Sequence, residues 1–124
     1  MATLGYGTVG SNRLSEAKAF YDALFASIGI HALFEHPSGG RIYGKNDNLI
    51  FGVLGPYDGN PATVGNGSMF AFAFRTRAEV DAFHAQALEL GGKDEGAPGL
   101  RAKGFYFSYF RDLDGNKLCA YNIG

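Results

Sequence analysis

Near its C-terminal end the sequence reads Asp112-Leu113-Asp114-Gly115-Asn116-Lys117-Leu118, a polar turn that leads into an apolar run. Asp-Gly is a strong signal for the tight turn of a β-hairpin, because these residues tolerate the backbone angles that such turns need. The flanking segments are rich in aromatic and apolar residues, as strands are. We therefore predict two strands, over 104–111 and 117–122, joined by this turn.

An amphipathic helix is predicted before this hairpin. Thr76-Arg77-Ala78-Glu79 matches a capping box, in which the hydroxyl and the carboxylate satisfy backbone amides at a helix start. Apolar residues then recur at steps of three and four up to Leu90, and Gly91-Gly92 ends the pattern. A strand over 68–74 precedes the helix, and 93–100, which holds Gly and Pro, is predicted as a loop or an irregular strand.

The N-terminal half repeats this order of elements. An offset of 63 residues pairs Glu79 with Glu16, Phe83 with Phe20 and Gly92 with Gly29. We predict one domain over 1–124, with halves of about 1–56 and 68–124 joined by a loop over 57–67. The elements expected in the first half are a strand over 4–10, a helix over 14–28 and strands over 31–36, 41–43 and 49–54.

Composition limits the classes of function. The 124 residues, 46% of them hydrophobic, suffice for the core of one domain. A net charge of −1 with scattered Lys and Arg argues against nucleic-acid binding. The single cysteine excludes an internal disulfide and a multi-cysteine zinc site, which fits a cytoplasmic protein. Neither a signal peptide nor an apolar run of about 20 residues is present, so we expect no membrane association.

Three motifs together resemble the vicinal oxygen chelate family, which includes glyoxalase I, bleomycin-resistance proteins and extradiol dioxygenases. They are Leu14–Tyr21, Val80–His84 followed by Gly91-Gly92, and the turn at 112–118, and they span nearly the whole chain. The resemblance implies an α+β fold of two tandem βαβββ modules that form a curled mixed sheet with a concave pocket. It also implies that two chains associate as a homodimer.

The resemblance further implies where metal-dependent relatives hold a divalent cation. Those positions fall on Tyr6, Met69 and Cys119, and the fourth falls in the strand 49–54, which has no carboxylate or amide. A phenol, a thioether and a thiol are poor ligands for hard cations, which prefer oxygen donors such as carboxylates. We therefore predict no metal and no other cofactor. His31, Glu35 and His36 are weaker metal candidates, and we interpret them as polar residues near a strand end.

Strand alternation suggests which side chains line the implied pocket. An aromatic, mostly neutral surface of this kind suits a flat or apolar small molecule. The hypotheses are a binding protein for such a ligand, a lyase, isomerase or dioxygenase-related enzyme that uses Tyr or Cys or an unrecognised metal, and a dimeric interaction subunit. We interpret Cys119 as a small buried residue rather than a nucleophile. The expected lining residues are Tyr6, Thr8, Met69, Phe107, Tyr109, Cys119 and Tyr121.

Overall fold

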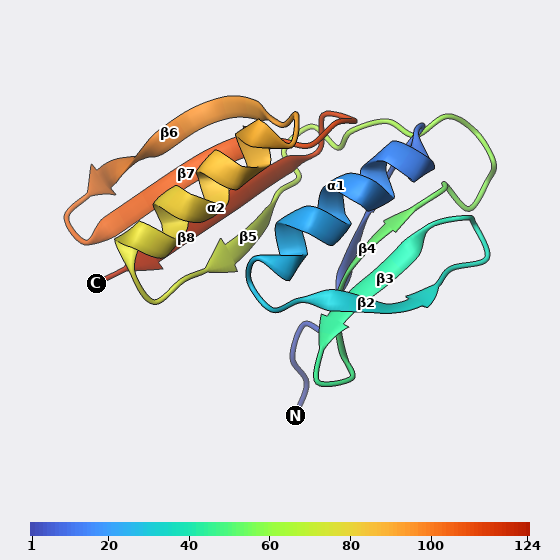
Figure 1. Cartoon of the computed structure of the whole chain (residues 1–124), viewed down its shortest axis with the longest axis horizontal. Helices are drawn as coiled ribbons and strands as arrows, with labels where there is room; N and C mark the ends of the chain where they lie inside the picture. The colour runs from blue at the N-terminus through green and yellow to red at the C-terminus, as the bar shows by residue number, and fades with distance from the viewer. The chain divides into compact units, whose positions relative to one another are not determined.

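The computed structural model describes residues 1–124 and divides them into two compact units, Met1–Val64 and Gly65–Gly124. Each unit contains a strand, a helix and three further strands in that order (Figure 1). The division falls inside the segment 57–67 that connects the two halves of the sequence. Neither helix has the length and apolar character that a membrane crossing requires.

The first unit is a mixed four-stranded sheet with one helix on it. The strand order is β1-β4-β3-β2, with β1 parallel to β4 and the other pairs antiparallel. Asn12, just after β1, exchanges two hydrogen bonds with the backbone of Ala62 and so fixes the connecting segment to this unit. The elements are β1 (Gly7–Gly10), α1 (Leu14–Ala26), β2 (His31–Glu35), β3 (Arg41–Lys45) and β4 (Asn48–Leu54).

The second unit repeats this arrangement, with the strand order β5-β8-β7-β6. The offset of 63 residues relates β1 to β5 and α1 to α2 in both of their bounds. This confirms the predicted fold class, α+β with two tandem βαβββ modules. The elements are β5 (Phe70–Ala73), α2 (Arg77–Glu89), β6 (Lys93–Ala102), β7 (Phe105–Arg111) and β8 (Lys117–Ile123).

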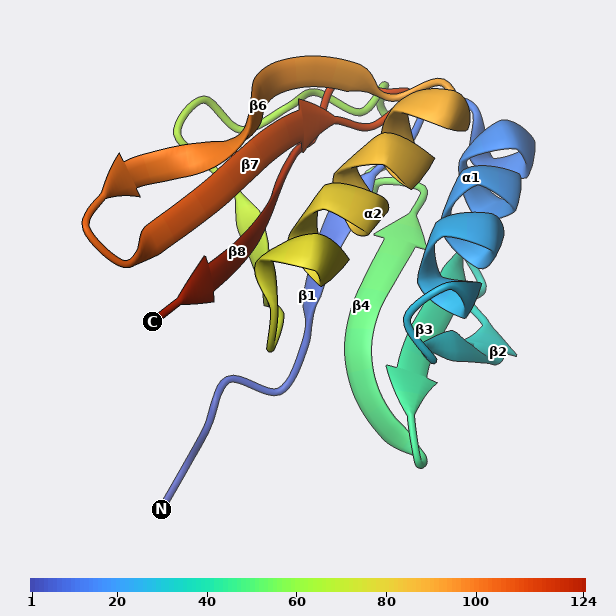
Figure 2. The ribbon, with the colours of Figure 1, turned by 60° about the vertical axis from the view of Figure 1, so that its left-hand side comes forward.

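Aromatic side chains join each helix to its sheet. In the first unit the ring of Tyr21 on α1 lies 5.0 Å from that of Phe51 on β4, and both residues are buried. In the second unit Phe83 on α2 lies 5.9 Å from Phe110 on β7. Figure 2 shows α2 along one face of its sheet. Because side chains alternate along a strand, every second residue faces away from the helix.

The ends of several helices and strands differ from those predicted from the sequence. β1 begins at Gly7 rather than at residue 4, because its ladder is with β4 alone and starts at Gly7. α1 ends at Ala26 rather than at residue 28, where the Ser27 hydroxyl donates to the Leu24 carbonyl oxygen, and Gly29 turns the chain at φ +77°. β4 begins at Asn48, so this strand does contain one amide.

The segment after α2, predicted as a loop or an irregular strand, is the ten-residue β6. It pairs with β7 through a ladder that shifts register at three places. Such shifts insert unpaired residues into a strand and bend it. The glycines and the proline that suggested a loop, Gly96, Pro98 and Gly99, fall at these irregularities.

Candidate functional site

The face of the second sheet that points away from α2 carries most of the predicted site. Phe110 contacts Phe83 of α2, and the Tyr106 hydroxyl donates to Asp81 Oδ1 at 2.6 Å, so these β7 side chains face the helix. The alternate residues of β7 face the other way, together with the β8 residues that pair with them. We call this surface the open face of the second unit and define it by Phe105, Phe107, Tyr109, Cys119 and Tyr121.

Stacked rings form the centre of the open face. Phe107 lies 4.9 Å from Tyr121, its partner on β8, with an angle of 12° between the two ring planes. Phe105 and Tyr109, on either side along β7, stack on Phe107 at 6.1 and 6.3 Å. The result is a row of nearly parallel rings, whose faces can pack against a further flat molecule.

Two cations flank one end of this row. Arg101 of β6 places its guanidinium carbon 5.6 Å from the centre of the Tyr109 ring, and Lys117 of β8 places Nζ 5.0 Å from it. Neither residue is among the lining residues predicted from the sequence. Strand alternation along β8 places Lys117 on the same face as Cys119 and Tyr121, so the sequence did contain a signal that could have identified Lys117. For Arg101 no such signal exists, because register shifts in β6 interrupt the alternation of side chains.

Cys119 is fully buried on β8. Burial raises the pKa of its thiol to about 11, against smaller opposing effects from a hydrogen bond to Ser108 and from the charges of Lys117 and Arg101. The reactive form of a cysteine is the thiolate, which is scarce near neutral pH when the pKa is this high. The environment of Cys119 therefore matches a small buried residue rather than a nucleophile.

The remaining predicted residues lie at other places. Met69 immediately precedes β5 and is 41% exposed, and Tyr6 immediately precedes β1 and is 49% exposed. Thr8 pairs with Gly52 of β4, on the face of the first sheet that points away from α1. Phe107, Tyr109, Cys119 and Tyr121 thus share the open face of the second unit, whereas Tyr6 and Thr8 belong to the first unit.

The donor atoms at the positions where the resemblance places metal ligands do not suit a hard cation. Tyr6, Met69 and Cys119 offer a phenol, a thioether and a thiol with a raised pKa. β4 offers one amide, that of Asn48, which lies at the turn end of the strand opposite Lys45. Nowhere in the chain do three or more His, Cys, Asp or Glu side chains come together in a way that could hold a metal ion.

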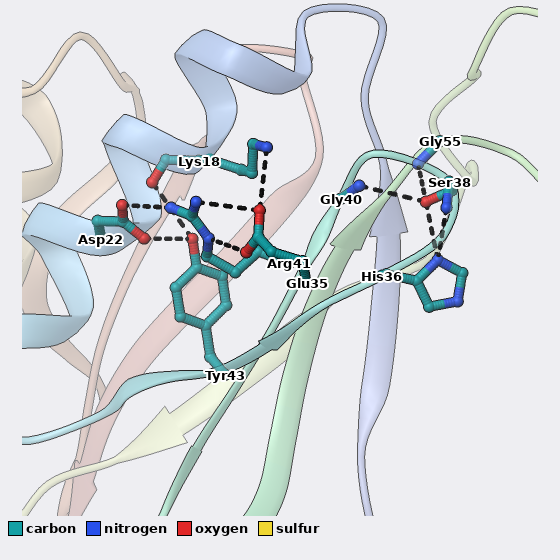
Figure 3. A network of polar contacts seen from close by, with 9 residues as sticks. All are labelled: Lys18, Asp22, Glu35, His36, Ser38, Gly40, Arg41, Tyr43 and Gly55. Atoms are coloured by element: carbon teal, nitrogen blue, oxygen red, sulfur yellow. Dashed lines mark hydrogen bonds and ion pairs between the residues drawn. The ribbon is translucent and has the colours of Figure 1, made fainter.

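Two of the weaker metal candidates, Glu35 and His36, take part in polar contacts of the first unit (Figure 3), whereas His31 is an exposed residue at the start of β2. Arg41 bridges Glu35 and Asp22, with a distance of 2.6 Å to each carboxylate, and this pairing with Arg41 holds the pKa of Glu35 below its usual value. His36 Nδ1 accepts a hydrogen bond from the Ser38 amide at 3.1 Å. The contacts of Glu35 and Arg41 tie β2 to β3 and α1, and the contact of His36 lies within the connection from β2 to β3, so both have a structural role.

The tandem βαβββ arrangement is that of the class of proteins which the three sequence motifs resemble. No protein-family model and no curated protein matches the sequence. Among solved structures, a glyoxalase/bleomycin resistance protein from Albidiferax ferrireducens is 39% identical, with 98% of each chain covered and a TM-score of 0.87. The chain therefore belongs to the glyoxalase/bleomycin resistance protein family, within the vicinal oxygen chelate superfamily.

More distant structures share the fold. Lactoylglutathione lyase from Agrobacterium tumefaciens is 20% identical, with 98% of this chain and 94% of that chain covered and a TM-score of 0.72. A genomically encoded fosfomycin resistance protein from Listeria monocytogenes is 17% identical, with 100% and 95% covered and a TM-score of 0.75. At such identities the likeness is one of fold, and function has to be argued from the site.

Proposed function

We propose that this protein binds a small, flat, largely apolar or aromatic molecule on the open face of the second unit, without a metal ion. The observation that carries the proposal is the row of stacked rings at Phe105, Phe107, Tyr109 and Tyr121. Helix α2 packs on the other face of the sheet, and on the open face Phe105 is exposed while Phe107, Tyr109 and Tyr121 are half-buried. A flat ligand would extend the stack through dispersion and ring–ring contact.

Binding is favoured over catalysis by the side chains of the site. A nucleophile or a general base needs a pKa that matches its task, whereas the pKa of the Cys119 thiol is raised to about 11. The positions at which the resemblance places metal ligands, Tyr6, Met69 and Cys119, carry a phenol, a thioether and a thiol. We therefore infer that the ligand is held rather than transformed.

A neutral flat probe, 2-naphthamide, tests this proposal. We expect calorimetric titration to show that wild-type protein binds the probe and that Phe107→Ala weakens binding by about tenfold, because the central ring of the stack is lost. Phe34→Ala is the matched control, since Phe34 is a half-exposed phenylalanine of β2 in the other unit. No detectable binding, or equal affinity of the wild type and Phe107→Ala, would contradict the proposal.

A further inference from the structure

We propose that the ligand of the open face is an anion, namely a flat aromatic carboxylate whose charge is held by Arg101 and Lys117 while its ring stacks on the aromatic row. This inference rests on the proposed function and adds the charge of the ligand to it. It stands on the placement of two basic side chains on either side of β7, in contact with the same ring.

Neither cation forms an ion pair with a carboxylate. The ion pairs of the second unit join His84 to Asp94 and Arg111 to Glu95. Glu95 pairs with Arg111 at 3.0 Å, and its pKa is lowered mainly by that hydrogen bond and less by the charges of Lys117 and Lys93. One carboxylate thus faces several cations, and positive charge stays in excess beside Tyr109. An anion placed there gains charge-assisted hydrogen bonds, which are stronger than bonds between neutral groups.

The backbone of β6 holds Arg101 in place. Its Nη1 and Nη2 atoms each donate a hydrogen bond of 2.9 Å, to the carbonyl oxygens of Gly99 and Ala97. A guanidinium has five N–H donors, so further donors remain for a ligand. An arginine fixed in this way loses little side-chain entropy when an anion binds.

The glycines of β6 make this arrangement possible. A Cβ atom at Gly96 would lie 3.1 Å from Tyr109 Cδ2 and 3.2 Å from Arg101 Nη2, and one at Gly99 would lie 3.2 Å from Arg101 Nη1. These distances are shorter than ordinary van der Waals contacts, so larger residues would crowd the guanidinium. The glycines of β6 thus leave room for the Arg101 side chain to cross β6 and contact the ring of Tyr109.

The same excess of positive charge affects the pKa of the Cys119 thiol. Burial raises its pKa, but the charges of Lys117 and Arg101 both act in the opposite direction, as nearby cations do on any group that ionises to an anion. Cys119 pairs with Tyr109 across β7 and β8, so the thiol lies at the part of the open face that the two cations flank.

The test compares 2-naphthoate with 2-naphthamide, which has nearly the same shape but no charge, by calorimetric titration of the full chain. We expect the wild type to bind the carboxylate about tenfold more tightly. Arg101→Gln and Lys117→Gln should each remove most of this preference and leave the affinity for 2-naphthamide within about twofold. Added salt should weaken the binding of the carboxylate alone.

Arg77→Gln is the matched control, because Arg77 lies 5.3 Å from the ring of Tyr106, which faces α2 instead. It removes one positive charge and one cation–ring contact from the same unit, and we expect it to leave both affinities unchanged. Equal wild-type affinity for the two probes, or an equal loss in Arg77→Gln, overturns the inference and leaves the proposed function standing. If neither probe binds, both are overturned.

Discussion

Tyr43 shows how one buried polar atom contributes to the first unit. The side chain is fully buried, and its hydroxyl lies 2.7 Å from Asp22 Oδ1. We expect Tyr43→Phe to lower the free energy of unfolding by about 1.5 kcal/mol, the usual contribution of a hydrogen bond to a charged group. Urea denaturation measures the loss, and Tyr57→Phe, at a fully exposed tyrosine, should have no effect.

The same hydroxyl predicts a dependence on pH. Burial and the hydrogen bond to Asp22 raise the pKa of Tyr43 well above its ordinary value of 10.0. Above pH 10.0 the unfolded chain loses this proton while the folded chain keeps it, so the stabilisation by Tyr43 is complete below that pH and declines above it. The difference in stability between the wild type and Tyr43→Phe should therefore shrink from pH 9 to pH 11. A constant difference would contradict this assignment.

At the scale of the element, the β3–β4 turn offers a stabilising substitution. Asn46 and Asp47 have positive φ angles of 51° and 66°, as the central residues of a type I′ turn do. Glycine adopts such angles without the steric cost that a Cβ atom brings. We expect Asp47→Gly to raise the free energy of unfolding by about 0.5 kcal/mol. Asn48→Gly, one residue further and inside β4, should lower it in the same urea experiment.

Elements were predictable where a local signal decides them. The capping box at Thr76 and Glu79 is present as predicted, with both hydrogen bonds at 3.1 Å, and it fixes the start of α2. Pairing between strands determines the remaining elements and their ends. β1 is shorter than its sequence suggests because its ladder is confined to one stretch of β4, and β6 is a strand because β7 pairs with it despite its glycines and proline.

The candidate site was predictable where its residues lie in regular strands. Alternation in regular strands suffices to put Phe107, Tyr109, Cys119 and Tyr121 on one face. Tyr6 and Met69 were placed by alternation too, yet each lies just before its strand, where the ladder no longer fixes the direction of a side chain. Arg101 could not be found, because its position depends on register shifts and on hydrogen bonds to backbone carbonyls.

For the whole molecule, we predict that stability does not depend on divalent metal ions. A metal that binds the folded state raises the melting temperature in proportion to its binding free energy. Tyr6, Met69 and Cys119, the positions at which the resemblance places metal ligands, carry donors that suit hard cations poorly. We expect EDTA, Mg²⁺, Mn²⁺ or Ni²⁺ to change the melting temperature by less than about 1 °C in a thermal-shift assay. An increase of several degrees with one ion, reversed by EDTA, would contradict the proposal that the site holds no metal.

The row of stacked rings also makes intrinsic tyrosine fluorescence a way to detect ligand binding. The sequence has seven tyrosines and no tryptophan, so tyrosine emission is not masked by the stronger indole signal. Tyr109 and Tyr121 both lie in that row, in contact with Phe107. Occupation of the open face should quench part of the intrinsic fluorescence, so candidate ligands can be screened in solution with unlabelled protein.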